Sequence, residues 1–164
     1  QKKGVARPQG GFRHKYCIVS LVCRDTGEAR SVFTDKTTHE AVANIVRANV
    51  DRESRLYTDD HVHYWKVGKE FEGGHYSVRH SIGEYSAGGC HTNTIEGYFS
   101  IMKRGMRGIY QWCAEKHLHR YLAEFDFRYT NREATGCNDA DRADRLLRGI
   151  VGKRLTYQTT LARA

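Results

Sequence analysis

The sequence predicts an α/β domain in which a mixed β-sheet is flanked by helices. Two apolar segments, at 16–23 and 29–34, are joined by the turn sequence RDTGE, a pattern that favours a β-hairpin. Two short strands further along alternate with helical segments, as in sheets whose strands are joined through helices. From about residue 92 onward the pattern is helical. A chain of 164 residues is long enough for one compact domain with a real core.

The first half of the chain alternates strands and helices. Residues 1–14 are basic, polar and glycine-rich without periodicity, so they are expected to form an arm or loop. After the hairpin, a helix is expected to begin at Thr37 or Thr38 and to run to about Val50. Glu40 lies three residues after Thr37, which suits a capping box. The remaining segments are a strand at 55–58, a short helix at 62–70, a strand at 75–81 and a glycine-rich connection at 83–89.

The second half is predicted to hold three helices. The first begins near Thr92 or Asn93 and runs to about Gly105. The second covers about 114–129, where apolar residues recur at helical spacing and are expected to be core: Leu118, Tyr121, Leu122, Phe125 and Tyr129. The third covers about 139–150. The domain therefore spans 15–157, and residues 158–164 form a tail.

Composition favours a nucleic-acid partner. Twenty-seven basic residues against nineteen acidic ones give a net charge of +8, and cations that bind phosphates release counterions from nucleic acid. A basic protein without such a partner is the alternative. Five cysteines in no C-x-x-C spacing predict reduced thiols rather than a zinc ribbon or a disulfide framework. No apolar run reaches the length of a membrane span, and the basic N-terminal segment leads into no apolar signal-peptide core.

Two carboxylates are candidate metal ligands. Asp59 directly follows a short strand, and Glu96 lies in the first turn of a predicted helix. Carboxylate oxygens suit Mg²⁺, and paired metal ions carry out in-line phosphoryl transfer. Each residue also has a simpler interpretation. Asp59 could only form a turn, and Asn93-x-x-Glu96 could be a capping box.

The helix that contains Glu96 predicts a basic face. Glu96, Ser100, Lys103 and Arg107 are spaced at i, i+4, i+7 and i+11 and form one stripe. An apolar stripe beside it consists of Ile95, Phe99, Met102 and Met106. The basic residues could hold a nucleic-acid backbone, or they could form an ordinary solvated face.

The histidine pairs and Trp112 point to no further functional site. The spacing of His61 with His63, and of His117 with His119, would point the rings apart on helices and predicts no metal site. Trp112 is expected to pack in a loop, with a DNA contact as the alternative.

Several segments together resemble the catalytic domain of DDE-type transposases from a group of bacterial insertion sequences. The most specific is HTNTIEGYFSIMKRG at 91–105, and others are RLYTDD, HYSVRHS, GEY, KHLHRYLAEFDFRYTNR and GIVGKRLTY. The resemblance covers nearly all of 15–157. It implies a ribonuclease-H-like fold, a two-metal site for Mg²⁺ or Mn²⁺, transposon-end and target DNA as partners, a homo-oligomer, and a bacterial cytoplasmic protein associated with the nucleoid.

The resemblance also implies roles for single residues. Asp59 matches the second catalytic and metal-binding carboxylate, and Glu96 matches the third. Lys103 matches a residue that contacts transposon-end DNA, and Arg104 and Arg107 would hold DNA phosphates beside it. Asp60 stands where the family commonly has an acidic neighbour and receives no metal role.

The first catalytic aspartate of the family has no match in this chain. In the family it lies in an Asp-Glu-x-[Tyr/Phe]-x-Gly-Gly strand, whereas the segment 16–23 matches the family's second strand. The first, central strand would lie between the hairpin and the strand that ends at Asp59. The chain is therefore expected to be an incomplete catalytic domain without the upstream zinc ribbon, and to be inactive alone.

Three functions follow from these observations. The first is metal-dependent DNA strand cleavage and strand transfer. The second is a catalytically inactive transposase remnant or DNA-binding module. The third is a related ribonuclease-H-like nuclease.

Overall fold

The structure, a computed structural model, describes residues 17–78 and 91–153. The arm at 1–14, the connection at 83–89, the tail at 158–164 and the end of the strand expected at 75–81 lie outside the described residues. The elements, in chain order, are β1 (Cys17–Val22), β2 (Ala29–Thr34), α1 (His39–Asn49), β3 (Leu56–Asp59), α2 (Tyr64–Gly68), β4 (His75–Val78), α3 (Asn93–Gly105), α4 (Leu118–Thr130) and α5 (Asp139–Ile150). The α/β class and the order of the elements are confirmed.

The strands form two small sheets. β1 and β2 pair antiparallel, with Cys17 opposite Thr34. β3 and β4 pair parallel, with Leu56 opposite His75, and α2 connects them. Among residues 17–78 and 91–153 the structure therefore confirms the α/β class but not one mixed sheet. There the hairpin and the parallel pair are separate sheets, because no ladder of backbone hydrogen bonds joins β1 to β3.

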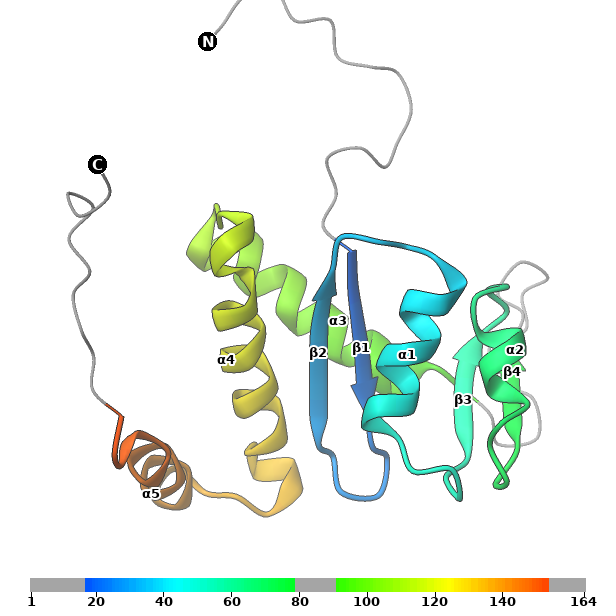
Figure 1. The fold of residues 1–164 in the computed structure, drawn as a ribbon. Helices are drawn as coiled ribbons and strands as arrows, with labels where there is room; N and C mark the ends of the chain where they lie inside the picture. Colours follow the sequence, from blue (N-terminus) through cyan, green and yellow to red (C-terminus); the bar gives the residue numbers. More distant parts are fainter. Residues whose placement is uncertain (1–16, 79–90, 154–164) are drawn as a thin grey trace, which may run out of the picture.

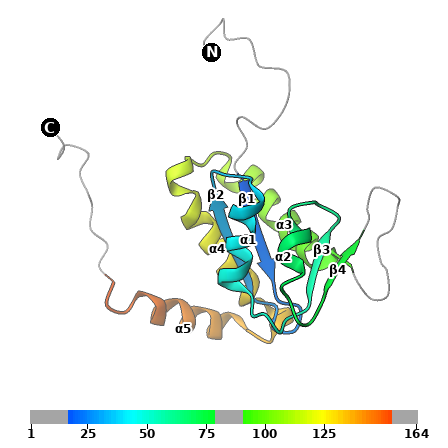
Figure 2. The same ribbon diagram turned by 45° about the vertical axis from the view of Figure 1, so that its right-hand side comes forward.

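Helices cover both faces of the hairpin, α1 on one face and α3 on the other (Figures 1 and 2). The strand period of two divides the apolar residues of β1 between two cores. Val19 and Leu21 face the core under α1 and α2, and Ile18 and Val22 face the core under α3 and α4. The first core also contains Val42, Ala43, Val46, Leu56, Val67 and Phe71. The second contains Ala29, Tyr98, Met102, Cys113, Leu118, Leu122 and Phe125.

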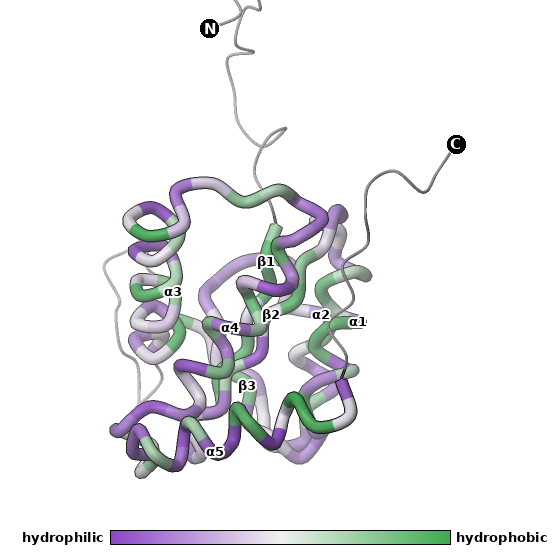
Figure 3. The backbone as a smooth tube through the Cα atoms, turned by 90° about the vertical axis from the view of Figure 1, so that its left-hand side faces the viewer, coloured by the Kyte–Doolittle hydropathy of each residue, from purple (hydrophilic) through white to green (hydrophobic). Residues whose placement is uncertain are grey.

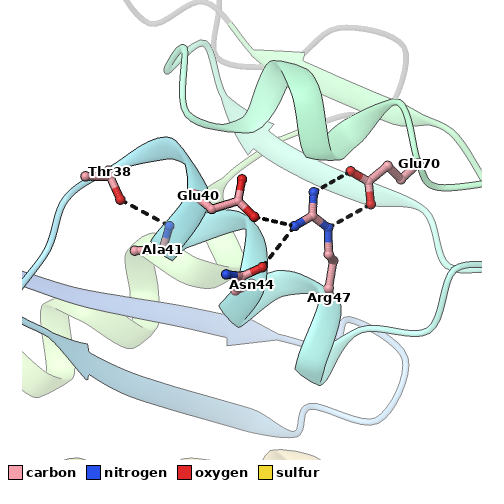
Figure 4. Close-up of polar contacts among 6 residues, drawn as sticks. All are labelled: Thr38, Glu40, Ala41, Asn44, Arg47 and Glu70. Atoms are coloured by element: carbon pink, nitrogen blue, oxygen red, sulfur yellow. Dashed lines mark hydrogen bonds and ion pairs between the residues drawn. The ribbon is translucent and has the colours of Figure 1, made fainter.

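The start of α1 is capped by Thr38, whose hydroxyl accepts a hydrogen bond from the Ala41 N–H at 3.2 Å (Figure 4). The capping box between Thr37 and Glu40 is wrong, because Glu40 instead binds Arg47 at 3.1 Å. Arg47 also donates two hydrogen bonds to Glu70, at 2.7 and 2.9 Å. The bonds to Glu70 raise the pKa of Arg47 and lower that of Glu70. This ion pair ties α1 to the segment that follows α2.

A polar network fixes α3 and α4 against β2. The Asp126 carboxylate on α4 accepts hydrogen bonds from the Ser31 N–H at 2.7 Å and from the Tyr98 hydroxyl at 2.6 Å. Tyr98 lies on α3 and is 1% exposed. Its burial, followed by the bond to Asp126, raises its pKa. Because buried polar groups are costly when unpaired, this network sets how α3 lies on the hairpin.

The last helix, α5, has no buried residue. Arg142 and Arg145 on it donate to the backbone and side-chain oxygens of Asn131, at 2.7 and 2.6 Å. Leu146, Leu147, Ile150 and the following Val151 are exposed, and Figure 3 shows hydrophobic and hydrophilic residues alternating along the helix. In the part of the chain that the structure describes, no helix is long and apolar enough to cross a membrane.

Candidate functional site

Asp59 is the last residue of β3 and is exposed. One of its carboxylate oxygens lies 3.4 Å from the His61 N–H, which is the geometry of a turn-forming aspartate. Asp59 also helps to raise the pKa of Tyr64, although the larger cause there is the burial of the tyrosine. The turn and the exposure are both present, so the structure leaves this carboxylate open to a ligand.

A side chain on the neighbouring strand, β4, holds the strand that carries Asp59. The Thr58 hydroxyl donates to the Asp59 carbonyl at 2.7 Å and lies 2.8 Å from Nε2 of His75 on β4. Burial lowers the pKa of His75, so the neutral ring can donate its Nε2–H to Thr58. Gly68 makes room for this ring, because a Cβ there would lie 2.2 Å from the His75 Nδ1.

Glu96 lies in the first turn of α3 and is exposed. The helix begins after Thr92, whose hydroxyl donates to the Glu96 carboxylate. Asn93 is the first helical residue rather than the cap, and the Thr92 side chain makes no capping hydrogen bond to the backbone. The capping box between Asn93 and Glu96 is therefore wrong, because the helix begins one residue too early for it.

Arg24 connects the segments that carry the two carboxylates, and sequence reasoning missed it. Its guanidinium lies 4.0 Å from the ring centroid of Tyr57 on β3. The same guanidinium donates to the His91 carbonyl just before α3 and lies 3.4 Å from the His91 Nδ1. Arg24 stands in the RDTGE turn, where a charged residue resembles any solvated turn residue. Periodicity and spacing therefore gave no signal for this contact.

The basic residues at the end of α3 and in the turn after it line one hollow. Ser100, Lys103, Arg104, Arg107 and Gly108 line this open hollow of about 560 Å³. The Lys103 ammonium lies 5.7 Å from the Phe99 ring centroid, within reach of a cation–π contact. The apolar stripe beside it packs into the second core as predicted. We call these five residues the basic hollow.

The last two residues of the basic hollow, Arg107 and Gly108, lie in a turn that follows α3. A π-helical turn over Met106–Tyr110 is followed by Gln111, whose φ is 58°. The expectation that Trp112 packs in its loop is wrong, because its side chain is 75% exposed. By contrast, Tyr121, Phe125 and Tyr129 on α4 belong to the second core as predicted.

Three histidines lie close together near Asp59. The ring centroids of His61 and His63 are 4.4 Å apart, and those of His39 and His63 are also 4.4 Å apart. The expectation that the rings of His61 and His63 point apart is wrong, because both residues precede α2 rather than lying on a helix. Burial, followed by the charges of His61 and His39, lowers the pKa of His63.

The described residues do not assemble a complete metal site. Within 17–78 and 91–153, no group of three or more histidine, cysteine, aspartate or glutamate side chains is arranged to hold a metal ion. The structure therefore places Asp59 and Glu96 at exposed ends of elements that Arg24 connects, and it groups Lys103, Arg104 and Arg107.

Comparison with known proteins agrees with the motif at 91–105. The family model of the ISXO2-like transposase domain matches residues 1–130, which include β3, the whole of α3 and the basic hollow. No curated protein and no solved structure matches the chain. Because the family model covers well over half of the sequence, the chain belongs to the ISXO2-like transposase domain family.

Proposed function

We propose that this domain binds DNA and takes part in metal-dependent DNA strand cleavage and strand transfer during transposition of an insertion sequence. One observation supports the proposal most directly. Lys103 and Arg104 at the end of α3 and Arg107 just after it line a single hollow, and the first turn of α3 carries Glu96. An exposed cationic hollow fits the phosphates of a nucleic-acid backbone, and the helix fixes its position relative to the carboxylate.

We propose that the three cations hold DNA by its phosphates rather than by its bases. All three side chains are exposed, so they can exchange bound counterions for phosphate groups. Arginine can bind a phosphate through two parallel N–H bonds, whereas lysine acts as a point charge. Contacts of this kind position the DNA without reading its sequence.

Asp59 and Glu96 are the residues that would hold Mg²⁺ or Mn²⁺. Both offer exposed oxygen ligands, the type that these hard cations prefer. A bound pair of such ions would activate the attacking oxygen and stabilise the leaving one. In the protein, the Thr92 hydroxyl orients the Glu96 carboxylate. The Thr58–His75 bond fixes the strand that ends at Asp59.

A ribonuclease-H-like arrangement is part of this proposal. An antiparallel hairpin, a helix, a strand that ends on an acidic residue and a later acidic helix follow in the order which that fold requires. Within the described residues, all four strands have one unpaired edge, which leaves β1 and β3 free to pair with a central strand. A homo-oligomer that holds two transposon ends is also part of the proposal.

A DNA-binding module without strand cleavage is the second candidate. The basic hollow supports it, because its cations need no metal ion to bind phosphates. The two candidates agree on DNA binding and differ on cleavage, so they can be separated with the same protein.

Fluorescence anisotropy of a labelled DNA duplex tests the shared prediction. The triple variant Lys103→Gln, Arg104→Gln and Arg107→Gln should bind more weakly, and the slope of log affinity against log salt should fall by about 2 to 3. The control variant Arg55→Gln, Lys66→Gln and Lys69→Gln removes the same charge from exposed residues elsewhere. Equal losses in both variants would show that only net charge matters and would remove the hollow from the proposal.

Nicking of supercoiled plasmid in Mg²⁺ or Mn²⁺ separates the candidates. Cleavage by the chain that is lost in Glu96→Gln and in Asp59→Asn supports the first candidate. DNA binding without cleavage under every condition supports the second. Cleavage that survives both substitutions would assign the chemistry to other residues, as in an unrelated nuclease activity.

A further inference from the structure

Trp112 projects from a tight turn of the backbone. The N–H of Trp112 donates to the carbonyl of Tyr110 at 2.5 Å across Gln111, which closes a three-residue γ-turn. In the described ranges, Gln111 is the single non-glycine residue with a positive φ. Such a backbone persists only when its surroundings hold it in place. The exposed position of Trp112 therefore follows from the conformation of this turn.

Both neighbours of the turn are anchored. The Tyr110 ring meets Tyr121 and Phe125 edge to face, with centroids 4.8 and 5.9 Å apart. Cys113, directly after Trp112, is buried in the same core. Gln111 and Trp112, which lie between these anchors, are exposed, Trp112 to 75%. Ile109, just before Tyr110, is 77% exposed.

The segment that leads into this turn is cationic. Gly108 is the last residue of the basic hollow and lies four positions before Trp112. Arg107 directly precedes Gly108. Aromatic side chains are common at contact surfaces, and Trp112 is more exposed than Trp65, at 75% against 54%. A partner that suits both the indole and the cations has to present flat aromatic surface beside negative charge. Nucleic acid with an accessible base has both, and stacking on an aromatic side chain is its usual mode of binding.

We propose that Trp112 stacks on an unpaired base of the DNA strand whose phosphates lie in the basic hollow, with Ile109 beside it. The inference rests on the proposed DNA binding and adds a contact to the bases. A fixed turn presents the indole at little cost in conformational entropy. The site would therefore prefer DNA with a single-stranded end over a blunt duplex.

Intrinsic fluorescence gives a direct test, because the chain has only two tryptophans. The variant Trp65→Phe leaves Trp112 as the sole reporter. A duplex with an unpaired thymine tail should quench its fluorescence at saturation, and the same duplex with an abasic tail should not. Equal quenching by both tails would overturn the inference.

Affinity gives an independent readout. Trp112→Ala should weaken binding of the tailed duplex by roughly 5- to 150-fold, the range for loss of one stacked base. Trp112→Phe should retain most of the affinity. Trp65→Ala, which removes an exposed tryptophan on α2, should change nothing. Circular dichroism checks that each variant is folded.

The two proposals fail in different ways. If Trp112→Ala binds every DNA as the wild type does while the basic-hollow variant does not, stacking is wrong and DNA binding stands. If the wild-type chain binds no DNA at all, both proposals fall. Equal weakening of blunt, tailed and abasic duplexes by Trp112→Ala would show a general contact and would also overturn stacking.

Discussion

Single residues outside the candidate site position the segments that carry its carboxylates. Arg24 is the main example, because it stacks on Tyr57 two residues before Asp59 and binds the His91 backbone five residues before Glu96. It therefore connects the strand and the helix that carry the two carboxylates. This contact joins residues 67 positions apart, so no local sequence pattern could predict it.

Arg24→Ala should loosen the link between β3 and α3. A hydrogen bond from a charged group contributes about 1.5–3 kcal/mol, and we expect a loss of about 1–2 kcal/mol in the free energy of unfolding because Arg24 is only half-buried. Arg24→Lys should recover little, because lysine lacks the planar donor pair and the stacking surface. Urea unfolding measures both.

Arg30→Ala is the matched control for Arg24. Arg30 is exposed and makes surface bonds to Asn49 and Glu28, so its loss should change stability by less than about 0.5 kcal/mol. A stability loss in Arg24→Ala no larger than in Arg30→Ala would contradict the positioning role.

Because of Tyr98, the free energy of unfolding is predicted to fall at alkaline pH. Its pKa is raised in the folded state by burial and by the bond to Asp126. The stabilisation is therefore fully present below the pKa of an unfolded tyrosine, about 10, and is lost as pH rises above it. Compared with Tyr98→Phe, the wild type should lose up to about 1.4 kcal/mol per pH unit above pH 10. Urea unfolding between pH 8 and 11 measures this difference, and an unchanging difference would mean that Tyr98 ionises normally.

Secondary elements were largely predictable because most of them bury a periodic apolar face. The spacing in α1, α3 and α4 and the alternation in β1 match the two cores. Caps and pairing were less predictable. Thr38 was foreseen as a possible cap of α1, but Glu40 binds Arg47 rather than the helix backbone. Side-chain patterns did not predict whether β1 pairs with β3, because that pairing depends on backbone hydrogen bonds between strands that are distant in the sequence.

The docking of α5 is predicted to depend on Arg142. Its guanidinium binds the Asn131 carbonyl at 2.7 Å, whereas the apolar residues of α5 remain exposed. Arg142→Ala should therefore speed hydrogen exchange of the α5 amides about tenfold, which corresponds to a loss of about 1.4 kcal/mol in the free energy of local opening. Exchange in α1 should remain unchanged.

Arg148→Ala is the comparison for Arg142. Arg148 pairs with Asp144 inside α5 and is mostly exposed, so its removal should leave exchange in α5 nearly unchanged. Equal acceleration in both variants would show that α5 is held by its own helical hydrogen bonds rather than by Asn131.

For the whole molecule, the family was predictable from a linear motif, whereas the site geometry was not. The run at 91–105 predicted the transposase family, and the family match confirms it. Helical spacing predicted a stripe that contains Ser100, Lys103 and Arg107, whereas Arg104 was assigned from the resemblance, and all four residues line the basic hollow. The Arg24 contact and the exposed Trp112 depend on how distant segments pack, so only the structure revealed them.

The whole fold is predicted to be independent of the candidate metal ligands. Asp59 and Glu96 are exposed and belong to neither hydrophobic core, so Asp59→Asn with Glu96→Gln should shift the Tm in EDTA by less than about 2 °C. A metal ion that binds only the folded state stabilises it by about 1.4 kcal/mol at tenfold excess over its Kd. Mn²⁺ should therefore raise the wild-type Tm by about 3–5 °C and leave the Tm of the double variant unchanged. An equal rise in both proteins would place the bound metal elsewhere, and a large loss of Tm in EDTA would show that these carboxylates serve the fold.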